Sequence, residues 1–460
     1  FIPEEFPKLG DIDNLMNLSY DELSSYILNL YFDELGEDIL REASKKAYDD
    51  KFPEEVVPVK MADKAAFLEL YHGKTLAFKD MALSILPHLL KASLKLKKDD
   101  RKVLILVATS GDTGKAALEG FKDIEDLSIA VYFPDGGVSE VQKLQMITQR
   151  GDNTYVAAIE GNFDDAQRGV KEIFTDENYK SELEKKSYIL SSANSINIGR
   201  LIPQVVYYVY GYINLIKNGS IEKSDSINIA VPTGNFGNVL AAYYAKRMGL
   251  PVNKLIIASN DNRVLTDFFD TGKYDSDREL YLTSSPSMDI LVSSNLERFL
   301  YHISDSNEEK IKDAMKKLNR DKLFEWDLFS DEEFAASASE EDISKSIKKV
   351  YEDFDYIIDP HTATAYHAYE KYLEKEKDDK FTLIASTASP FKFSNKVLES
   401  LDMEVPDDEF MSLELLSKKM KAEIPLSLRE LKSMPIRHKD IIKPSEMRGF
   451  IDEIVGDEND

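Results

Sequence analysis

The sequence predicts an α/β protein with two parallel-sheet domains that flank a cleft, preceded by a small helical lobe. Short apolar runs rich in Val, Ile and Leu alternate with helix-length segments, which is typical of parallel α/β architecture. These runs form two clusters, at 102–190 and 227–385, and the helical stretch 197–217 joins them. The chain has 460 residues, more than one hydrophobic core usually serves, so more than one domain is expected.

Along the chain, the predicted elements run from a helical start through six strands. Residues 1–60 are acidic and carry apolar residues at helical spacing, so they form the helical lobe. The segment 303–350 is rich in charge, contains the only tryptophan, Trp326, and ends in an amphipathic pattern, so we expect an exterior helical insertion there. The expected strands are 102–108, 128–133, 154–159, 227–231, 255–258 and 381–385.

This pattern divides the chain into four parts. The helical lobe takes residues 1–60, and a small α/β domain takes 99–214. A large α/β domain combines 61–98 with 215–400 and includes the insertion. Residues 401–460 form a C-terminal extension, and the pattern indicates no role for it.

The net charge argues against some classes of function. With 84 Asp and Glu against 58 Lys and Arg, the net charge is −26, which argues against binding to nucleic acid or to a membrane surface. The acidity is uneven: residues 1–60 carry −9, residues 61–250 carry no net charge, and residues 251–460 carry −17. A site for an anionic ligand is therefore expected in the neutral stretch.

The absence of cysteine excludes disulfides, a cysteine nucleophile and cysteine-based metal sites, and it favours a reducing, cytoplasmic location. Every apolar run is shorter than the ~18 to 20 residues that span a bilayer. Among six histidines, only His361 and His367 are close in sequence, and their spacing does not suit a helical metal site, so no metal is expected. The start at Phe1 lacks the basic and apolar regions of a signal peptide, and we interpret it as processed or truncated.

The clearest local motif is a strand, a glycine loop and a helix start, with the loop Pro232-Thr-Gly-Asn-Phe-Gly-Asn238. Backbone N–H groups and the helix dipole at such a turn can hold a phosphate without a basic side chain. The alternative is an ordinary tight turn, and the glycine spacing is not that of a dinucleotide site. A second unit of this kind, Thr109-Ser-Gly-Asp-Thr-Gly114, follows the strand at 102–108 and suits a carboxylate or a phosphate.

Three further segments carry candidate residues. Lys79 begins a helical run after Phe78, where desolvation would favour the neutral amine of Schiff-base chemistry, although a lone lysine is more often solvated. The segment Asn194-Ser-Ile-Asn-Ile-Gly-Arg200 can bind an oxyanion through its arginine, or it can simply cap a helix. The segment Ser386-Thr-Ala-Ser-Pro390 places hydroxyl groups after a strand, where α/β sheets hold ligands, or it is a plain turn.

Together and in this order, these segments resemble threonine synthase, a pyridoxal-phosphate enzyme of fold type II, in its longer class. The resemblance extends over residues 1–400. It rests on seven motifs, which are His72-Gly-x-Thr-Leu-Ala-Phe-Lys79-Asp80, Thr109-Ser-Gly-Asp-Thr-Gly114, Asn194-Ser-x-Asn-x-x-Arg200, Pro232-Thr-Gly-Asn-Phe-Gly-Asn238, Ser287-Met-Asp-Ile-Leu-Val-Ser-Ser-Asn-Leu-Glu-Arg298, Asp359-Pro-His-Thr-Ala363 and Ser386-Thr-Ala-x-Pro390.

The resemblance implies a role for each candidate. Lys79 would form the Schiff base with pyridoxal 5′-phosphate and serve as acid and base. Thr387 would meet the pyridine nitrogen of the cofactor, and Asp112 would lie near its phenolic oxygen. The loop that would hold the cofactor phosphate consists of Gly234, Asn235, Phe236, Gly237 and Asn238. The residues that would bind the substrate are Ser110, Gly111 and Thr113 for its carboxylate and Asn194, Ser195 and Arg200 for its phosphate.

The implied reaction converts O-phospho-L-homoserine and water to L-threonine and phosphate by γ-elimination and β-addition. The expected partners are this small substrate and, at most, a second copy of the chain, so the protein is a monomer or a homodimer. Two alternatives stay open: another fold type II lyase or dehydratase, and a non-catalytic paralogue that binds phosphorylated ligands. Two departures from the family pattern bear on the paralogue, since Lys74 replaces a proline and Ser389 replaces a histidine.

Overall fold

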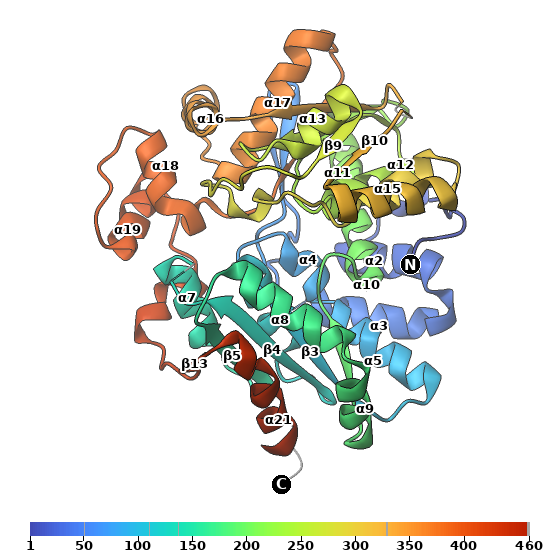
Figure 1. Cartoon of the computed structure of the whole chain (residues 1–460). Coiled ribbons are helices and arrows are strands. Elements are labelled where there is room, and N and C mark those ends of the chain that lie inside the picture. The colour runs from blue at the N-terminus through green and yellow to red at the C-terminus, as the bar shows by residue number, and fades with distance from the viewer. Residues whose placement is uncertain (50, 110, 137, 328–329, 458–460) are drawn as a thin grey trace.

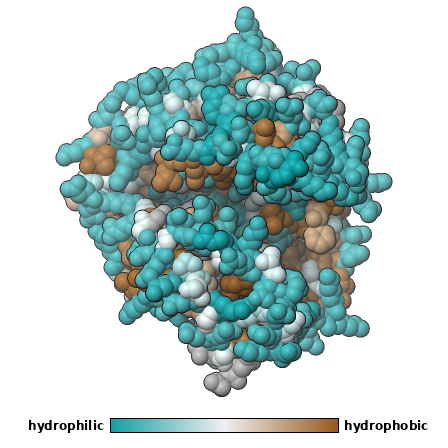
Figure 2. All heavy atoms as spheres, viewed as in Figure 1, coloured by the Kyte–Doolittle hydropathy of each residue, from teal (hydrophilic) through white to brown (hydrophobic). Residues whose placement is uncertain are grey.

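The computed structural model describes residues 1–49, 51–109, 111–136, 138–327 and 330–457 (Figure 1). Two bodies, each built on a largely parallel sheet, lie one above the other in this view, with the N-terminal helices beside them. The visible surface is mostly hydrophilic, and apolar residues gather along the seam between the bodies (Figure 2). This arrangement confirms the predicted α/β class. Within the ranges given, no helix is long and apolar enough to cross a membrane.

The N-terminal segment is helical between residues 12 and 48. It contains α1 (Ile12–Leu15), α2 (Tyr20–Tyr31), η1 (Asp33–Leu35) and α3 (Glu37–Tyr48). Ser19 begins α2: its hydroxyl accepts a hydrogen bond from the Glu22 N–H, and the Glu22 carboxylate accepts one from the Ser19 N–H. The apolar faces of α2 and α3 share a core with α11 (Pro203–Lys217), so the lobe is part of the upper body.

The upper, large body is built on a six-stranded sheet. Its strands are β1 (Val59–Ala62), β2 (Ala65–Glu69), β7 (Ile227–Pro232), β8 (Val252–Ser259), β11 (Glu333–Ser337) and β12 (Thr382–Ser386). Their spatial order is β1-β2-β12-β7-β8-β11, and only the β1–β2 pair is antiparallel. A separate two-stranded sheet pairs β9 (Lys273–Asp275) with β10 (Leu323–Glu325).

Helices cover both faces of the large sheet, so its strands are buried on both sides. One face packs against α11 and α12 (Gly237–Met248) together with the N-terminal lobe. The other face packs against α16 (Glu340–Phe354) and α17 (Pro360–Glu376). The remaining helices of this body are α13 (Val264–Thr271), α14 (Leu296–Ile303), α15 (Glu308–Asp321), α18 (Ser394–Ser400) and α19 (Glu409–Met420).

The lower, small body is built on a five-stranded parallel sheet in the order β13-β5-β4-β3-β6. Its strands are β3 (Lys102–Ala108), β4 (Leu127–Pro134), β5 (Thr154–Ile159), β6 (Tyr188–Ser192) and β13 (Asp440–Ile442). Its helices are α5 (Leu86–Lys97), α6 (Asp112–Phe121), α7 (Glu140–Ile147), α8 (Phe163–Thr175), α9 (Glu177–Lys185) and α21 (Met447–Asp457). Alternate residues of β3 face opposite cores: Val103 packs with α5 and α6, and Leu104 packs with α8 and α21.

All six predicted strands are present, as β3, β4, β5, β7, β8 and β12. The segment 303–350 differs from the prediction, because β11 is an edge strand of the large sheet and Trp326 is buried. The β11 sequence, Glu-Phe-Ala-Ala-Ser, lacks β-branched residues and becomes a strand through its parallel pairing with β8. The expectation of an exterior helical insertion is therefore wrong for this part of the segment.

Three segments connect the two bodies across the predicted domain boundaries. Helix α5 precedes residue 99, yet its Leu86 belongs to the core of the small sheet. Helix α11 ends near residue 215, yet it packs in the large body. The C-terminal extension packs Leu416 on the large body and then supplies β13 and α21 to the small one. The boundary positions therefore stay a prediction. Short turns of the extension are α20 (Leu426–Arg429), η4 (Leu431–Ser433) and η5 (Pro444–Glu446).

Candidate active site

The lysine segment and the segment after β12 are joined by their backbones. The N–H of Phe78 donates to the carbonyl oxygen of Thr387 at 2.8 Å, and Ala77 forms an antiparallel bridge with Ala388. Lys79 is the first residue of the short helix α4 (Lys79–Leu83), directly after this bridge. The pairing therefore holds Lys79 near the buried Thr387, although 308 positions separate them in the sequence.

The Lys79 side chain is buried, with 8% of its surface exposed. Its Nζ donates a hydrogen bond to Ser287 Oγ at 2.9 Å and lies 3.5 Å from Asp112 Oδ2. Burial lowers the pKa of Lys79 to about 8, the charges of Lys392 and Arg200 add to this lowering, and Asp112 opposes it. Much of the amine is therefore neutral near pH 8, where it can act as a nucleophile or a base.

Asp112 begins α6 and faces two cations. Its Oδ1 accepts a hydrogen bond from Lys392, which lies in the turn η3 (Pro390–Phe393), and its Oδ2 faces Lys79. Burial would raise the pKa of Asp112, but the charges of Lys392 and Lys79 outweigh burial and hold that pKa well below its usual range. The carboxylate therefore stays ionised inside the protein. No sequence signal singles out Lys392, apart from its place just after the Ser386–Pro390 motif.

Ser287, the hydroxyl partner of Lys79, belongs to the turn η2 (Pro286–Met288). Its backbone N–H donates to His361 Nε2 at 3.3 Å, and His361 Nδ1 lies 2.8 Å from Asp359 Oδ2. Asp359 and His361 are buried at the start of α17, so this helix fixes the position of Ser287. The two motifs that contain Ser287 and His361 support the family resemblance, yet neither residue had a predicted role.

The glycine loop between β7 and α12 touches the surroundings of Lys79. Gly234 is so close to Ser287 that a Cβ atom on the glycine would lie 2.6 Å from the serine's carbonyl oxygen. Phe236 adopts a left-handed conformation, with φ of +61°, immediately before α12 begins at Gly237. The first backbone N–H groups of α12 have no helical partners, so this helix start is suited to bind a phosphate.

Asn238 adds a side-chain donor to the same helix start. Its Oδ1 accepts hydrogen bonds from the hydroxyl groups of Tyr207 and Tyr208, at 2.6 and 2.5 Å. Its buried Nδ2 has no partner within the described residues. Because two hydroxyl donors fix the orientation of the amide, the free N–H₂ group points away from them. An unsatisfied buried donor costs about 1 to 3 kcal/mol, a cost that a bound anion would remove.

Ser195 lies beside the glycine loop. Its Oγ is 3.3 Å from Ser294 Oγ, and Ser294 donates to Asn235 Oδ1 at 3.2 Å. The Nδ2 of Asn295 donates to the carbonyl oxygens of both Ser195 and Asn235, at 3.3 and 2.9 Å. Asn194 directly precedes Ser195 in the chain. One hydrogen-bond network therefore connects two of the predicted anion-binding segments.

Arg200 lies in the short helix α10 (Ile198–Leu201) and is buried. Its Nη1 donates to the carbonyl oxygen of Ala193 at 2.8 Å. Burial lowers the pKa of Arg200 to about 10, which still leaves the guanidinium charged near neutral pH. Within the described ranges Arg200 has no ion-pair partner, and its positive charge lowers the pKa of Lys79. A buried, unpaired guanidinium of this kind favours the binding of an anion.

The remaining predicted residues have different surroundings. Gly111 and Thr113 lie at the start of α6, and Ser110 falls outside the described residues. Of the two departures from the family pattern, Lys74 is exposed to solvent and Ser389 is buried. Lys74 is thus a solvated side chain, whereas the serine has replaced a larger residue inside the protein.

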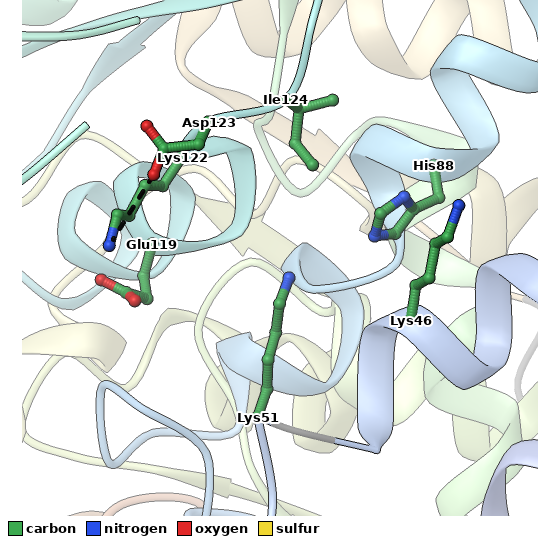
Figure 3. A pocket seen from close by; sticks show the side chains of 7 residues that line it. All are labelled: Lys46, Lys51, His88, Glu119, Lys122, Asp123 and Ile124. Carbon is green, nitrogen blue, oxygen red and sulfur yellow. Dashed lines mark ion pairs between the residues drawn. The ribbon is translucent and has the colours of Figure 1, made fainter. Parts of the chain in front are cut away.

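A pocket of 360 Å³ lies away from this site, between the N-terminal lobe and the small body (Figure 3). The lysines at 46 and 51 and the histidine at 88 are on one side of it, and Glu119 and Lys122 are on the other. None of the predicted site residues lines this pocket. Its lining residues are Lys46, Lys51, His88, Glu119, Lys122, Asp123 and Ile124.

Comparison with known proteins identifies a family and several relatives. Residues 66–387 match the family described as pyridoxal-phosphate dependent enzyme. The threonine synthase of Schizosaccharomyces pombe is 39% identical over 442 residues, covering 86% of this chain and 83% of that protein. Threonine synthase-like 1 of Homo sapiens is 37% identical, covering 88% of this chain but 56% of that protein, so the chain spans about half the length of this relative. The solved structure of threonine synthase from yeast has a TM-score of 0.88 at 31% identity, covering 99% of this chain and 93% of that one.

The residues around Lys79 fit the cofactor of this family. Schiff-base formation needs a lysine amine that loses its proton near neutral pH. Burial lowers the pKa of Lys79 to about 8 and so meets this need. A phosphate group needs donors without other partners, and the start of α12 with the free amide of Asn238 provides them. Since the family match covers most of the chain and the chemistry of the site agrees with it, this chain belongs to the family of pyridoxal-phosphate-dependent enzymes.

Proposed function

We propose that this chain is a threonine synthase, which converts O-phospho-L-homoserine and water to L-threonine and phosphate. The observation that carries the proposal is the buried Arg200, which has no ion-pair partner among the described residues and whose charge lowers the pKa of Lys79. A substrate with its own phosphate needs an anion contact in addition to the glycine loop, and Arg200 can supply it. Relatives named threonine synthase, similar over most of their length, support the same activity.

When bound, pyridoxal 5′-phosphate supplies an electron sink that stabilises negative charge next to the amino group of the substrate. Lys79 moves the protons, because a group with a pKa of about 8 can both accept and return a proton near neutral pH. Ser287 orients the amine by accepting its hydrogen bond at 2.9 Å. Asp112 keeps a fixed negative charge beside the amine and favours the state in which Lys79 holds a proton.

The other residues bind and orient. Arg200, Asn194 and Ser195 hold the substrate phosphate, which leaves from the γ carbon. Gly111 and Thr113 hold the α-carboxylate at the start of α6, and Ser110, which precedes them in the sequence, is assigned to the same group. Thr387 would offer a neutral hydroxyl to the pyridine nitrogen of the bound cofactor, and such a partner would leave the ring a weaker electron acceptor than a carboxylate would. The residues assigned to the cofactor phosphate are Gly234, Asn235, Phe236, Gly237 and Asn238.

Two properties of the whole protein belong to the same proposal. We place it in the cytoplasm, because a chain without cysteine gains nothing from an oxidising compartment. Its partner is the small phosphorylated substrate, without nucleic acid or membrane, and the chain acts as a monomer or a homodimer. Size-exclusion chromatography with light scattering distinguishes these two states, and a larger assembly would contradict both.

The deciding experiment compares two substrates with the purified, cofactor-loaded chain. Phosphate release from O-phospho-L-homoserine, with threonine as the second product, is expected. Ammonia release from threonine without phosphate release would instead identify a dehydratase of the same fold. The variant Lys79→Ala, which lacks the amine, should lose turnover and should carry no cofactor covalently after borohydride reduction, with circular dichroism as the check that it is folded.

A non-catalytic paralogue is the second candidate, and one observation favours it. Ser389 is buried where the family pattern has histidine, so a hydroxyl stands in place of an imidazole beside the Lys79 segment. Such a paralogue would bind phosphorylated ligands without converting them. A protein that stays colourless after addition of the cofactor, yet binds O-phospho-L-homoserine in calorimetry, would establish the paralogue and exclude the synthase.

A further inference from the structure

Lys392 connects three parts of the site that are far apart in the sequence. Its side chain is fully buried, and its Nζ donates to the carbonyl oxygen of Thr75 at 3.0 Å and to the carboxylate of Asp112. Thr75 precedes Lys79 on the same loop, and Asp112 begins α6 of the small body. A buried ammonium group is costly without partners, so these two acceptors are what allow a lysine at this position.

The Asp112 carboxylate is shared between two ammonium groups. Its Oδ1 faces Lys392 and its Oδ2 lies 3.5 Å from Lys79 Nζ. The shorter contact belongs to Lys392, so the carboxylate is engaged mainly by that lysine. The three side chains carry one net positive charge when all are ionised, and their burial strengthens each interaction relative to water.

We propose that Lys392 is a positioning residue whose charge neutralises Asp112, so that Asp112 orients Lys79 without locking it as an ammonium ion. Without Lys392, the buried carboxylate would have Lys79 as its one cationic partner among these three groups. That pair would hold a proton on Lys79 well above neutral pH. With Lys392 in place, Lys79 can give up its proton where the enzyme works. This role of Lys392 adds to the proposed function. It depends on that function only in assuming that Lys79 moves protons in the reaction.

A simpler role for Lys392 would be that of a tether. Its hydrogen bonds could merely hold the Lys79 loop against α6, and any donor of similar length would then serve. The two roles differ in what a neutral donor can replace. Lys392→Gln keeps an N–H₂ group for the same acceptors but removes the charge, whereas Lys392→Met removes both the charge and the donor.

If the charge of Lys392 matters, substitutions at Lys392 and at Asp112 should shift the pKa of Lys79 in opposite directions. When the positive charge at Lys392 is removed, the Asp112 carboxylate interacts with Lys79 alone among these three groups, so the pKa of Lys79 should rise. Removing the negative charge with Asp112→Asn leaves two cations without the carboxylate between them, so the pKa of Lys79 should fall. Both directions follow from the burial and charges that already set the pKa of Lys79 near 8. A loss of structure would instead expose Lys79 and raise its pKa in every variant.

The test measures how fast acetic anhydride acetylates Lys79 as a function of pH, in the 460-residue chain freed of cofactor, with peptide mass spectrometry as the readout. The measurement uses neither the substrate nor turnover, so its result is independent of whether the proposed reaction is correct. The matched control is Lys396→Met. Lys396 lies four residues further along the chain, and its ion pairs are with Glu340 and Glu399. Circular dichroism melting shows which variants are folded.

We expect the labelling midpoint near pH 8 in the wild-type chain and in Lys396→Met. In Lys392→Gln and Lys392→Met it should rise by about one pH unit or more, and in Asp112→Asn it should fall. If Lys392→Met does not fold, Lys392→Gln with Asp112→Asn suffices. A wild-type midpoint in Lys392→Gln would show a tether and overturn the proposal. A rise in Asp112→Asn would overturn it as well.

Discussion

Gly234 packs directly on the carbonyl oxygen of Ser287, where a Cβ atom would approach to 2.6 Å. The loop assigned to the cofactor phosphate and the turn that holds the Lys79 amine are therefore one packed unit, although 53 positions separate them in the sequence. Displacement of one must displace the other.

Gly234→Ala should weaken both functions of this unit. The added methyl group cannot fit against a backbone oxygen, so the turn at Ser287 must move and the hydrogen bond to Lys79 must lengthen. We expect a loss of turnover of up to about a hundredfold, the effect of a misplacement of about 1 Å in a catalytic group. The control is Gly449→Ala, an exposed helical position with open space around it, and equal effects in both variants would contradict the argument.

Asn238→Asp should weaken binding of the cofactor. The substitution keeps the shape of the side chain but replaces the free amide donor of α12 with a negative charge, where the cofactor phosphate is proposed to bind. We expect the cofactor Kd, measured by absorbance titration, to rise about tenfold or more, since charged hydrogen bonds contribute about 1.5 to 3 kcal/mol. The same change at the exposed Asn218 should leave this Kd unchanged. An unchanged Kd in Asn238→Asp would remove Asn238 from the phosphate site.

Arg200→Leu should act on the substrate and spare the cofactor. The guanidinium is buried and has no ion-pair partner within the described residues, so its removal breaks no internal salt bridge. We expect KM for O-phospho-L-homoserine to rise about tenfold or more, with the cofactor Kd unchanged. Arg263→Leu, at a surface arginine paired with Asp267, is the control. A loss of kcat with an unchanged KM would assign Arg200 to a different step.

His302 should make the fold less stable in acid. Burial lowers the pKa of His302 to about 4, helped by the charges of Arg247 and Arg298. The unfolded chain therefore takes up a proton near pH 6.5 that the folded chain refuses until about pH 4, and stability is lost as the pH falls through this window. The wild-type chain should lose more unfolding free energy between pH 7.5 and 5 than His302→Gln, as measured in urea. Equal losses would mean that His302 titrates normally in the folded state.

Ile451→Ala should destabilise the protein through the small sheet. Ile451 of α21 is fully buried in the core that also contains Leu104 and Tyr132. Truncation of a buried isoleucine costs about 2 to 5 kcal/mol, which denaturant unfolding can measure. Ile441→Ala, at an exposed position of β13 in the same extension, should cost less than about 0.5 kcal/mol. A small cost at Ile451 would mean that α21 is loosely attached.

The sequence predicts those parts of the fold that carry a local signal. The strands β3 and β5 are short apolar runs, and they form within their expected bounds because each is buried on both faces. The strands β11 and β13 lack such a run. They become strands only through pairing with β8 and β5, which are distant in the sequence, so no local pattern could reveal them.

The same limit applies to the site. Lys79 and the glycine loop stand out because a glycine-rich turn and a helix start have a recognisable local chemistry. Ser287 and Lys392 do not, because their roles depend on contacts with residues 208 and 280 positions away. A serine in a turn and a lysine after a proline are ordinary surface patterns. Tertiary packing within the large body makes Ser287 a partner of Lys79, and packing between the two bodies makes Lys392 a partner of Asp112.

The position of β13 at the edge of the small sheet has a consequence for biosynthesis. A ribosome delivers β1 and β2 of the large sheet, then β3, β4, β5 and β6, then the remaining strands of the large sheet, and only afterwards β13 and α21. Until that moment β5 is an open edge, and the apolar face that α21 will cover is bare. This interval is when a newly made chain is most exposed to pairing with another copy, so synthesis rate and chaperones should govern its yield more than its final stability does.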